Sequence, residues 1–157
     1  GDVYKRQIEN RLLVDHAVPN CRSNVLYKGA LQGDKASKLP EARTCWVGDV
    51  LIRAEAKGTD TYETNRNLVL TDGARADAIP NLEIETGEIA GAGHAATVGR
   101  FDDDQLFYLR SRGIREEDAT RLIIRGFFNE VLNQIPVESI REELIARVAG
   151  ELERNEN

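Results

Sequence analysis

Residues 94–100 read HAATVGR, and residues 101–114 follow directly as FDDDQLFYLRSRGI. Before this stretch the chain is rich in Thr, Val, Ile, Asn, Asp and Gly, which is typical of strands joined by tight turns. After it, acidic residues precede apolar residues at helical spacing, which predicts helices. The sequence therefore predicts a mainly β segment over residues 8–101 and a helical segment over residues 102–157. His94 lies close to the change.

Five runs of β-branched and other apolar residues predict short strands of three to eight residues, bounded by Gly, Asp, Asn or Pro. They are residues 12–14, 24–27, 46–53, 67–71 and 81–86. No amphipathic helix interrupts them, which argues against a βαβ sheet. The periodicity alone leaves two folds open, a β-sandwich and a solenoid of parallel coils.

Two local patterns sharpen this prediction. Leu82 and Ile84 alternate with Glu83 and Glu85, which predicts one buried and one solvent-exposed face of a strand. Residues 33–43 are polar and without a clear period, so we expect a surface loop there.

The helical segment predicts three helices. Asp102 and Gln105 have the spacing of a capping box, and Gly113 fits a left-handed C-terminal cap. The second helix begins with Glu116 and is expected to end at Pro136. Its apolar stripe consists of Ala119, Leu122, Ile123, Phe127 and Val131, widened by Ile124, Phe128 and Leu132.

The third helix is predicted to begin with a capping box formed by Ser139 and Glu142. Its apolar stripe is Ile140, Leu144, Val148 and Leu152. The second helix carries more apolar surface than one neighbour covers, so either an intramolecular bundle or another protein must cover it.

Composition narrows the function classes. The chain has 157 residues and a net charge of −6, with a balance of −1 over residues 1–100 and −5 over residues 101–157. An acidic C-terminal segment is repelled by phosphate backbones, so we expect no nucleic-acid binding. No apolar run approaches the roughly 18 residues of a membrane span, so we expect no membrane insertion. Two cysteines without metal-finger spacing make a reduced, cytoplasmic setting the default expectation.

The N-terminus and the cysteines support two further expectations. The chain contains no Met, so we expect it to be a fragment of a longer protein, with residues 1–7 as a non-native or disordered start. Cys21 and Cys45 form no CxxC pair, so we expect two small core side chains and no disulfide.

His94 is the candidate metal ligand, because imidazole binds many transition metals and its neighbours here are small. One histidine cannot hold a metal alone, and a structural role stays open. His16 is interpreted as a turn residue. The acidic run 102–104 is interpreted as a helix start, and the arginines from Arg110 to Arg125 as a salt-bridged, solvent-exposed face. No nucleotide-binding or zinc-protease motif is present.

Several longer sequence segments resemble those of one protein family. Residues 25–29 (VLYKG), residues 60–84 (DTYETNRNLVLTDGARADAIPNLEI) and residues 94–114 carry the resemblance, as do Asp15-His16 and Pro19-Asn20. Together they resemble the SufB/SufD family of the SUF iron–sulfur cluster assembly machinery over about residues 11–135. The segment HAATVG is more similar to the SufD branch, because the SufB branch usually has an acid after this histidine.

The resemblance implies a right-handed parallel β-helix followed by a small helical domain. It implies a non-catalytic scaffold subunit of the SufBCD complex, in which a SufB-like subunit pairs through the β-helices and a SufC-like ATPase docks on the C-terminal helices. The cofactor would be a transient iron–sulfur cluster shared with the SufB-like subunit, and none would be bound permanently by this chain alone.

The same resemblance implies roles for particular residues. His94 would hold iron of the nascent cluster, while Ala92 stands where many relatives have Cys, so this chain would supply nitrogen only. The implied SufC dock comprises Phe101, Leu106, Phe107, Tyr108, Ile123, Phe127 and Phe128. Two alternatives remain: a helical interaction module on an inert β stack, and a polysaccharide-acting β-helix enzyme, which the 6% aromatic content disfavours.

Overall fold

The computed structural model describes residues 7–33 and 42–154. The chain divides into two compact units, Gly1–Phe101 and Asp102–Asn157. The first contains six strands: β1 (Gln7–His16), β2 (Arg22–Leu31), β3 (Arg43–Ile52), β4 (Asp60–Val69), β5 (Arg75–Ile84) and β6 (Gly91–Arg100). The second contains three helices: α1 (Asp103–Ser111), α2 (Glu116–Leu132) and α3 (Glu138–Arg154).

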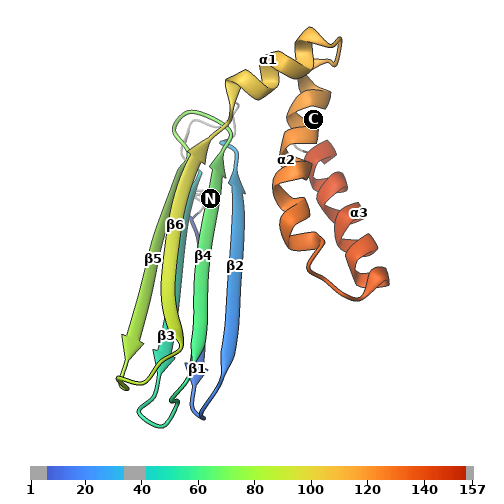
Figure 1. Cartoon of the computed structure of the whole chain (residues 1–157). Coiled ribbons are helices and arrows are strands. Elements are labelled where there is room, and N and C mark those ends of the chain that lie inside the picture. Colours follow the sequence, from blue (N-terminus) through green and yellow to red (C-terminus); the bar gives the residue numbers. More distant parts are fainter. Residues whose placement is uncertain (1–6, 34–41, 155–157) are drawn as a thin grey trace, which may run out of the picture. The chain divides into compact units, whose positions relative to one another are not determined.

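The strands form two three-stranded sheets, with the orders β1-β3-β5 and β2-β4-β6. All strand pairs are parallel, so successive strands of the chain belong alternately to the two sheets. Figure 1 shows that the strands of one sheet point opposite to those of the other. Strands that return to the same sheet in parallel after each crossing are consistent with a β-helix. A sandwich of antiparallel strands is excluded.

Each strand is longer than the sequence predicted. All six have ten residues, whereas the predicted runs had three to eight. The strand ends that the prediction missed are mostly polar; β4, for example, begins with Asp60-Thr61-Tyr62-Glu63. The prediction did not single out β6, because this strand is rich in Gly and Ala. In-register pairing with a neighbour holds such residues in strands despite their low propensity.

Other local expectations had mixed outcomes. His16 is the last residue of β1 and is buried, so its interpretation as a turn residue was wrong. The expected loop over residues 33–43 falls mostly outside the described residues, and Arg43 already belongs to β3. The expected non-native start also lies outside them, except that Gln7 begins β1.

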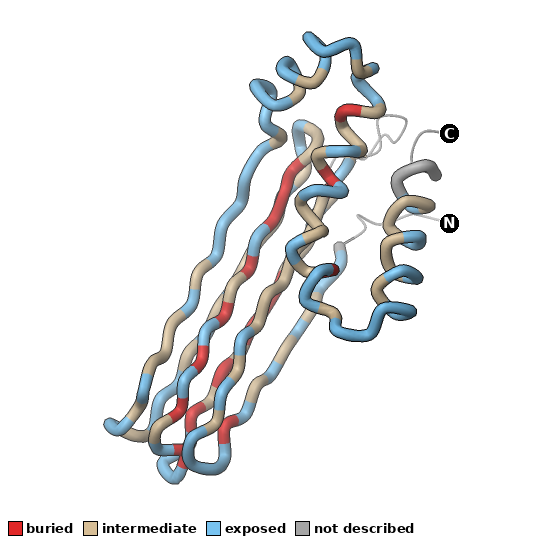
Figure 2. Tube along the Cα trace, turned by 45° about the vertical axis from the view of Figure 1, so that its right-hand side comes forward, coloured by how far each residue is buried: buried red, intermediate tan, exposed pale blue. Residues whose placement is uncertain are grey.

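The interior of the first unit is partly apolar and partly polar. Val50, Ile52 and Ala56 form a buried cluster, against which Val14, Leu82, Ile89 and Ala92 pack. The buried positions of β4, by contrast, include Thr61, Glu63, Asn65 and Asn67. Figure 2 shows buried and exposed positions alternating along such a strand. The inner face of β4 is therefore a row of polar side chains, which must find partners inside the protein.

The predicted alternation in β5 was half right. Leu82 packs against the apolar cluster, but Ile84 is 41% exposed. β5 is an edge strand of its sheet, so an apolar residue near its end has fewer neighbours to cover it.

The helix caps were predicted well at α1 and wrongly at α3. Asp102 accepts hydrogen bonds from the backbone N–H groups of Asp104 and Gln105, and Gly113 has φ +83°. Helix α2 ends at Leu132, before Pro136. Ser139 lies inside the first turn of α3 and not before it, so it does not cap the helix.

The apolar stripe of α2 is placed differently from the prediction. Its buried residues are Ala119, Ile124 and Leu132, whereas Leu122 is 49% exposed. Of these, Ile124 and Leu132 had been expected only to widen the stripe. The helix is apolar around much of its surface, so spacing alone did not identify the buried side.

A close contact at Gly48 gives a test of the interior packing. A Cβ atom at Gly48 would overlap Oε1 of Glu63 and lie 2.6 Å from Cζ2 of Trp46. Overpacking of this kind costs about 1–3 kcal/mol, so we expect Gly48→Ala in the complete protein to lower the free energy of unfolding by that amount in urea titrations. Gly87→Ala is the matched control, because nothing lies within 4 Å of its Cβ position. Equal stability of the two variants would contradict this packing.

Candidate functional site

His94 lies on β6, the edge strand of the β2-β4-β6 sheet, and its side chain is exposed. Ala92, two residues earlier, packs against the apolar interior cluster. Side chains two residues apart in a strand share a face, so His94 extends from the inner face of the sheet at an edge that no further described strand covers. Position 92 carries only a methyl group there.

The register brings His94 beside a buried acid. Glu63 on β4 is the backbone partner of His94 on β6. Paired residues of parallel strands have their side chains on the same face, about 4.8 Å apart along the sheet. The Glu63 side chain is 1% exposed. The sequence analysis did not single out Glu63, because its pairing with a residue so far along the chain appears only in the folded structure.

The electrostatics of Glu63 reflect its burial. Burial raises the pKa of the Glu63 carboxyl, the positive charge that His94 can carry lowers it, and the Asp49 carboxylate raises it, in decreasing order of effect. Neither carboxylate oxygen has a hydrogen-bond partner among the described residues. An ionised carboxylate without a donor is costly inside a protein, so this group is under electrostatic strain.

The described interior contains several buried polar atoms without a partner, and those of Trp46 and Glu63 belong to side chains that lie together. Among the described residues, the buried side-chain atoms without a partner are both Glu63 oxygens, Nε1 of Trp46 and Nδ2 of Asn65. Trp46 and Glu63 both lie against Gly48, and the Trp46 ring is 5.7 Å from that of Tyr27. Burial also raises the pKa of the Tyr27 hydroxyl. Such concentration of unsatisfied groups is uncommon in stable interiors and points to a specific role.

His16 belongs to a separate and satisfied network. Its Nε2 lies 3.0 Å from Oγ of Ser23, which lies 2.6 Å from Oγ1 of Thr61. The ring is 4% exposed. This chain of hydrogen bonds joins β1, β2 and β4 and satisfies the polar groups at that end of the interior, so the geometry favours a structural role for His16.

The described residues bring few metal-binding side chains together. The described part of the chain contains no group of three or more His, Cys, Asp or Glu side chains placed to hold a metal ion. Cys21 and Cys45 are free and only half-buried, so they are not the fully buried core side chains that were expected. His94 can offer one ring nitrogen, which does not hold a metal ion by itself.

The residues of the predicted dock differ in exposure. Phe107 and Tyr108 on α1 are 74% and 55% exposed, and the guanidinium of Arg112 lies 4.8 Å from the Tyr108 ring centre. The other members, Phe101, Leu106, Ile123, Phe127 and Phe128, are half-buried. The rings of Phe127 and Phe128 meet edge to face at 5.3 Å. Within the predicted dock, the α1 pair therefore presents the most apolar surface to solvent.

A groove between α2 and α3 was not predicted. It has a volume of about 330 Å³ and is lined by Asp118, Arg121, Leu122, Arg125, Leu132, Ile145, Val148 and Ala149. Leu122 and Val148 were assigned from their spacing to buried stripes. The exposure of Leu122 at this groove is the feature that spacing could not reveal.

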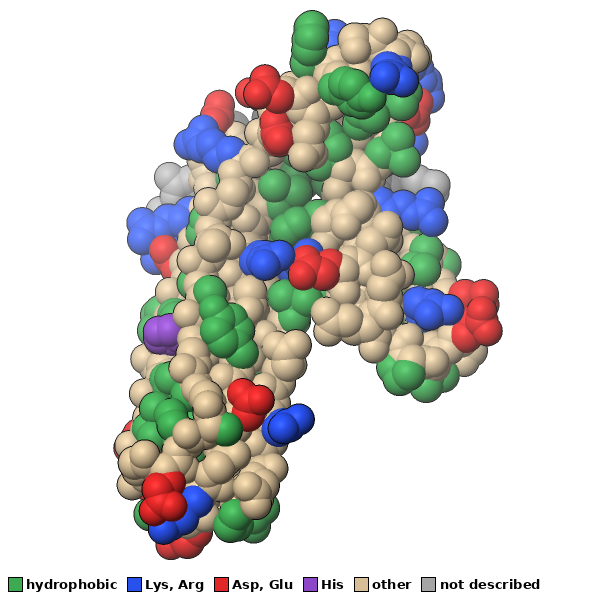
Figure 3. Space-filling model, viewed as in Figure 1, with side chains coloured by type: hydrophobic (Ala, Val, Ile, Leu, Met, Phe, Trp, Pro, Cys, Tyr) green, Lys and Arg blue, Asp and Glu red, His purple; other side chains and the backbone are tan. Residues whose placement is uncertain are grey.

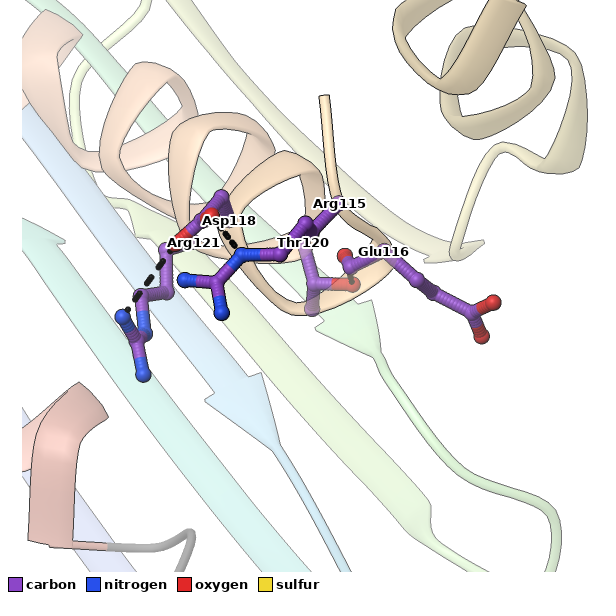
Figure 4. A network of polar contacts seen from close by, with 5 residues as sticks. All are labelled: Arg115, Glu116, Asp118, Thr120 and Arg121. Atoms are coloured by element: carbon purple, nitrogen blue, oxygen red, sulfur yellow. Dashed lines mark hydrogen bonds and ion pairs between the residues drawn. The ribbon is translucent and has the colours of Figure 1, made fainter. Parts of the chain in front are cut away.

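The start of α2 is polar, as predicted. Arg115 and Arg121 both bind the Asp118 carboxylate, at 2.9 and 3.5 Å, and the Thr120 hydroxyl donates to the backbone oxygen of Glu116 (Figure 4). Arg110 pairs with Glu116. On the face drawn in Figure 3, basic and acidic side chains lie intermingled. The arginines of this region therefore form a salt-bridged surface.

None of the helices in the described ranges is long and apolar enough to cross a membrane.

Replacing Glu63 tests how much its buried carboxylate destabilises the folded protein. A carboxyl whose pKa is raised by folding binds its proton more tightly in the folded state, so stability is lost as pH rises through the folded-state pKa. We expect Glu63→Met to raise the free energy of unfolding near neutral pH by about 1–3 kcal/mol, and the gain to shrink in acid where the wild-type carboxyl is protonated. Urea titrations of the complete protein at several pH values measure both effects. The exposed Glu83→Met is the control, and a gain of equal size there would refute the interpretation.

Comparison with known proteins bears directly on this arrangement. Residues 3–127 match the model of the family described as SUF system FeS cluster assembly, SufBD core domain. The chain is 69% identical over 152 residues to an iron–sulfur cluster assembly SufBD family protein of Mycobacterium tuberculosis (strain ATCC 25618 / H37Rv), covering 97% of this chain and 38% of that protein. It is 67% identical over 147 residues to such a protein of Mycobacterium leprae (strain TN), covering 94% and 38%.

A more distant relative is named as a SufD protein. The iron–sulfur cluster assembly protein SufD of Escherichia coli (strain K12) is 35% identical over 144 residues, which are 92% of this chain and 32% of SufD. The chain thus spans 38% of the length of the two mycobacterial relatives. The family match extends across both sheets and through most of α2. The chain therefore belongs to the SufBD core family of the SUF iron–sulfur cluster assembly system.

Proposed function

We propose that this chain is the C-terminal part of a non-catalytic scaffold subunit on which nascent iron–sulfur clusters are assembled beside a SufB-like subunit. The observation that carries the proposal is the position of His94. It is exposed on the edge strand β6, where a second protein can approach it. The cluster is the cargo of this scaffold and not a permanent cofactor.

The strand arrangement supports the binding of a SufB-like subunit. We propose that the two parallel sheets are coils of a right-handed β-helix, since parallel crossovers are right-handed in about 98% of cases. An edge strand presents unpaired backbone groups, which favour pairing with another sheet. β5 and β6 are both edges. A SufB-like subunit bound along this edge would bring its own ligands close to His94.

The donor set fits a shared cluster. His94 offers a nitrogen donor, and Ala92 adds no thiol on the same face. A cluster held here therefore needs thiolate or carboxylate ligands from the SufB-like partner. In this scheme ATP hydrolysis belongs to a SufC-like ATPase docked on the helical unit.

A substitution at His94 tests the cluster role. The complete protein is co-expressed with its SufB-like and SufC-like partners, and clusters are reconstituted without oxygen. We expect His94→Ala to leave the complex intact but to lower cluster content at least several-fold, because one iron ligand is lost. Iron and sulfide analysis with visible absorption measures the change. Thr97→Ala, an exposed change on the same strand, is the matched control and should retain the cluster.

Two results would contradict the proposal. If the folded complete protein associates with neither partner, the scaffold role fails. If His94→Ala keeps full cluster content while removal of residues 102–154 abolishes partner binding, the chain is a helical interaction module on an inert β stack.

The exposed aromatic pair on α1 tests the dock for the SufC-like ATPase. We expect Phe107→Asp to reduce co-purification of that ATPase at least ten-fold, because a charge would replace 74%-exposed apolar surface at the contact. The SufB-like subunit should still co-purify. Ile140→Asp on α3 is the control, since Ile140 is 49% exposed but lies outside the proposed dock. Loss of the ATPase in the control alone would place the dock elsewhere.

A further inference from the structure

The buried acid on β4 lacks the donor that its burial requires. Glu63 is 1% exposed, and neither of its carboxylate oxygens accepts a hydrogen bond from a described residue. The desolvation cost of such a group is large unless a donor is supplied. A side chain that needs a donor and lies next to a functional group is a candidate for positioning that group.

The register leaves few candidates for the donor. Within its own sheet, Glu63 has two backbone partners, Val25 on β2 and His94 on β6. Val25 carries no polar atom in its side chain. The imidazole of His94, on the neighbouring strand, can donate an N–H.

The facing sheet restricts movement of the carboxylate. A Cβ atom at Gly48 on β3 would overlap Oε1 of Glu63, and the Trp46 ring fills the adjacent space. The carboxylate is therefore confined on that side, while β6 beyond it is an edge strand. Two other buried donors of the described residues lack a partner: Nε1 of Trp46 beside Gly48, and Nδ2 of Asn65, which lies two residues further along β4 on the same face. The choice among these donors has to be measured.

We propose that Glu63 is a positioning residue for His94: its carboxylate accepts one ring N–H of the imidazole and thereby fixes one tautomer. The other ring nitrogen then keeps its lone pair and faces outward, available to a metal. This is the carboxylate–histidine–metal relation that orients many metal-binding histidines. The use of that nitrogen for iron rests on the proposed function, whereas the fixed tautomer does not.

The tautomer of His94 is the direct test. The complete protein is labelled with ¹⁵N-histidine and studied by NMR without metal, in the pH range where the imidazole is neutral, and His94→Ala assigns the signal. We expect one tautomer of His94 in the wild type and a mixture in Glu63→Met, which has no acceptor. Glu63→Gln should keep one tautomer, because its amide oxygen still accepts. A merely space-filling role would make the two variants alike.

The contrary result is equally definite. An unchanged His94 tautomer in Glu63→Met, with the folded state retained, overturns the proposal. A change confined to the Trp46 indole signal also overturns it and assigns the carboxylate to Trp46. The urea titration already described for Glu63→Met shows whether that variant is folded.

Metal retention separates this proposal from the function proposed for His94. Loss of a partner that orients a metal-binding histidine lowers metal affinity about 10–100-fold, so cluster retention in the reconstituted complex should fall in Glu63→Met and recover in Glu63→Gln. If Glu63→Met alters the tautomer while His94→Ala leaves the cluster intact, positioning stands and the cluster role of His94 fails. If His94→Ala loses the cluster while Glu63→Met keeps both tautomer and retention, the cluster role stands and positioning by Glu63 fails.

Discussion

In-register parallel pairing is the constraint on which the first unit depends. Each strand of the β2-β4-β6 sheet matches its neighbour residue for residue over ten positions. A side chain on the inner face of the central strand β4 is therefore stacked between two specific residues, one on each side. This stacking places Glu63 between Val25 and His94, and it cannot change by one position without turning every inner side chain outward.

The interior shows a balance between stability and a functional arrangement. Aliphatic residues stack where Val14, Val50 and Leu82 occupy matching positions of β1, β3 and β5. On the other sheet, the inner face of β4 carries polar residues, and the side chains of Glu63 and Trp46, which carry unpaired atoms, lie together. Natural proteins tolerate such local cost where function requires it. The proposed link to His94 gives this cost a purpose.

The two units contribute different kinds of surface. The strand unit offers one exposed imidazole at a sheet edge, which suits the shared coordination of a cluster proposed above. The helical unit offers the α1 aromatic pair and the groove between α2 and α3, surrounded by paired charges. Apolar surface within a salt-bridged rim suits a protein partner better than a nucleic acid. Both features agree with a subunit that works by bringing other proteins together.

The amino-acid sequence by itself determined the β-to-helix order, the caps at Asp102 and Gly113, and the family, because these depend on local patterns and on long matching sequence segments. It also identified His94 as the candidate ligand, a role that stays a prediction. The sequence did not reveal the strand lengths or the position of His16 within β1, because pairing between distant strands overrides local propensity. Only the tertiary structure decided that Glu63 lies beside His94 and that Leu122 borders a groove, since both depend on which strands and helices become neighbours in space.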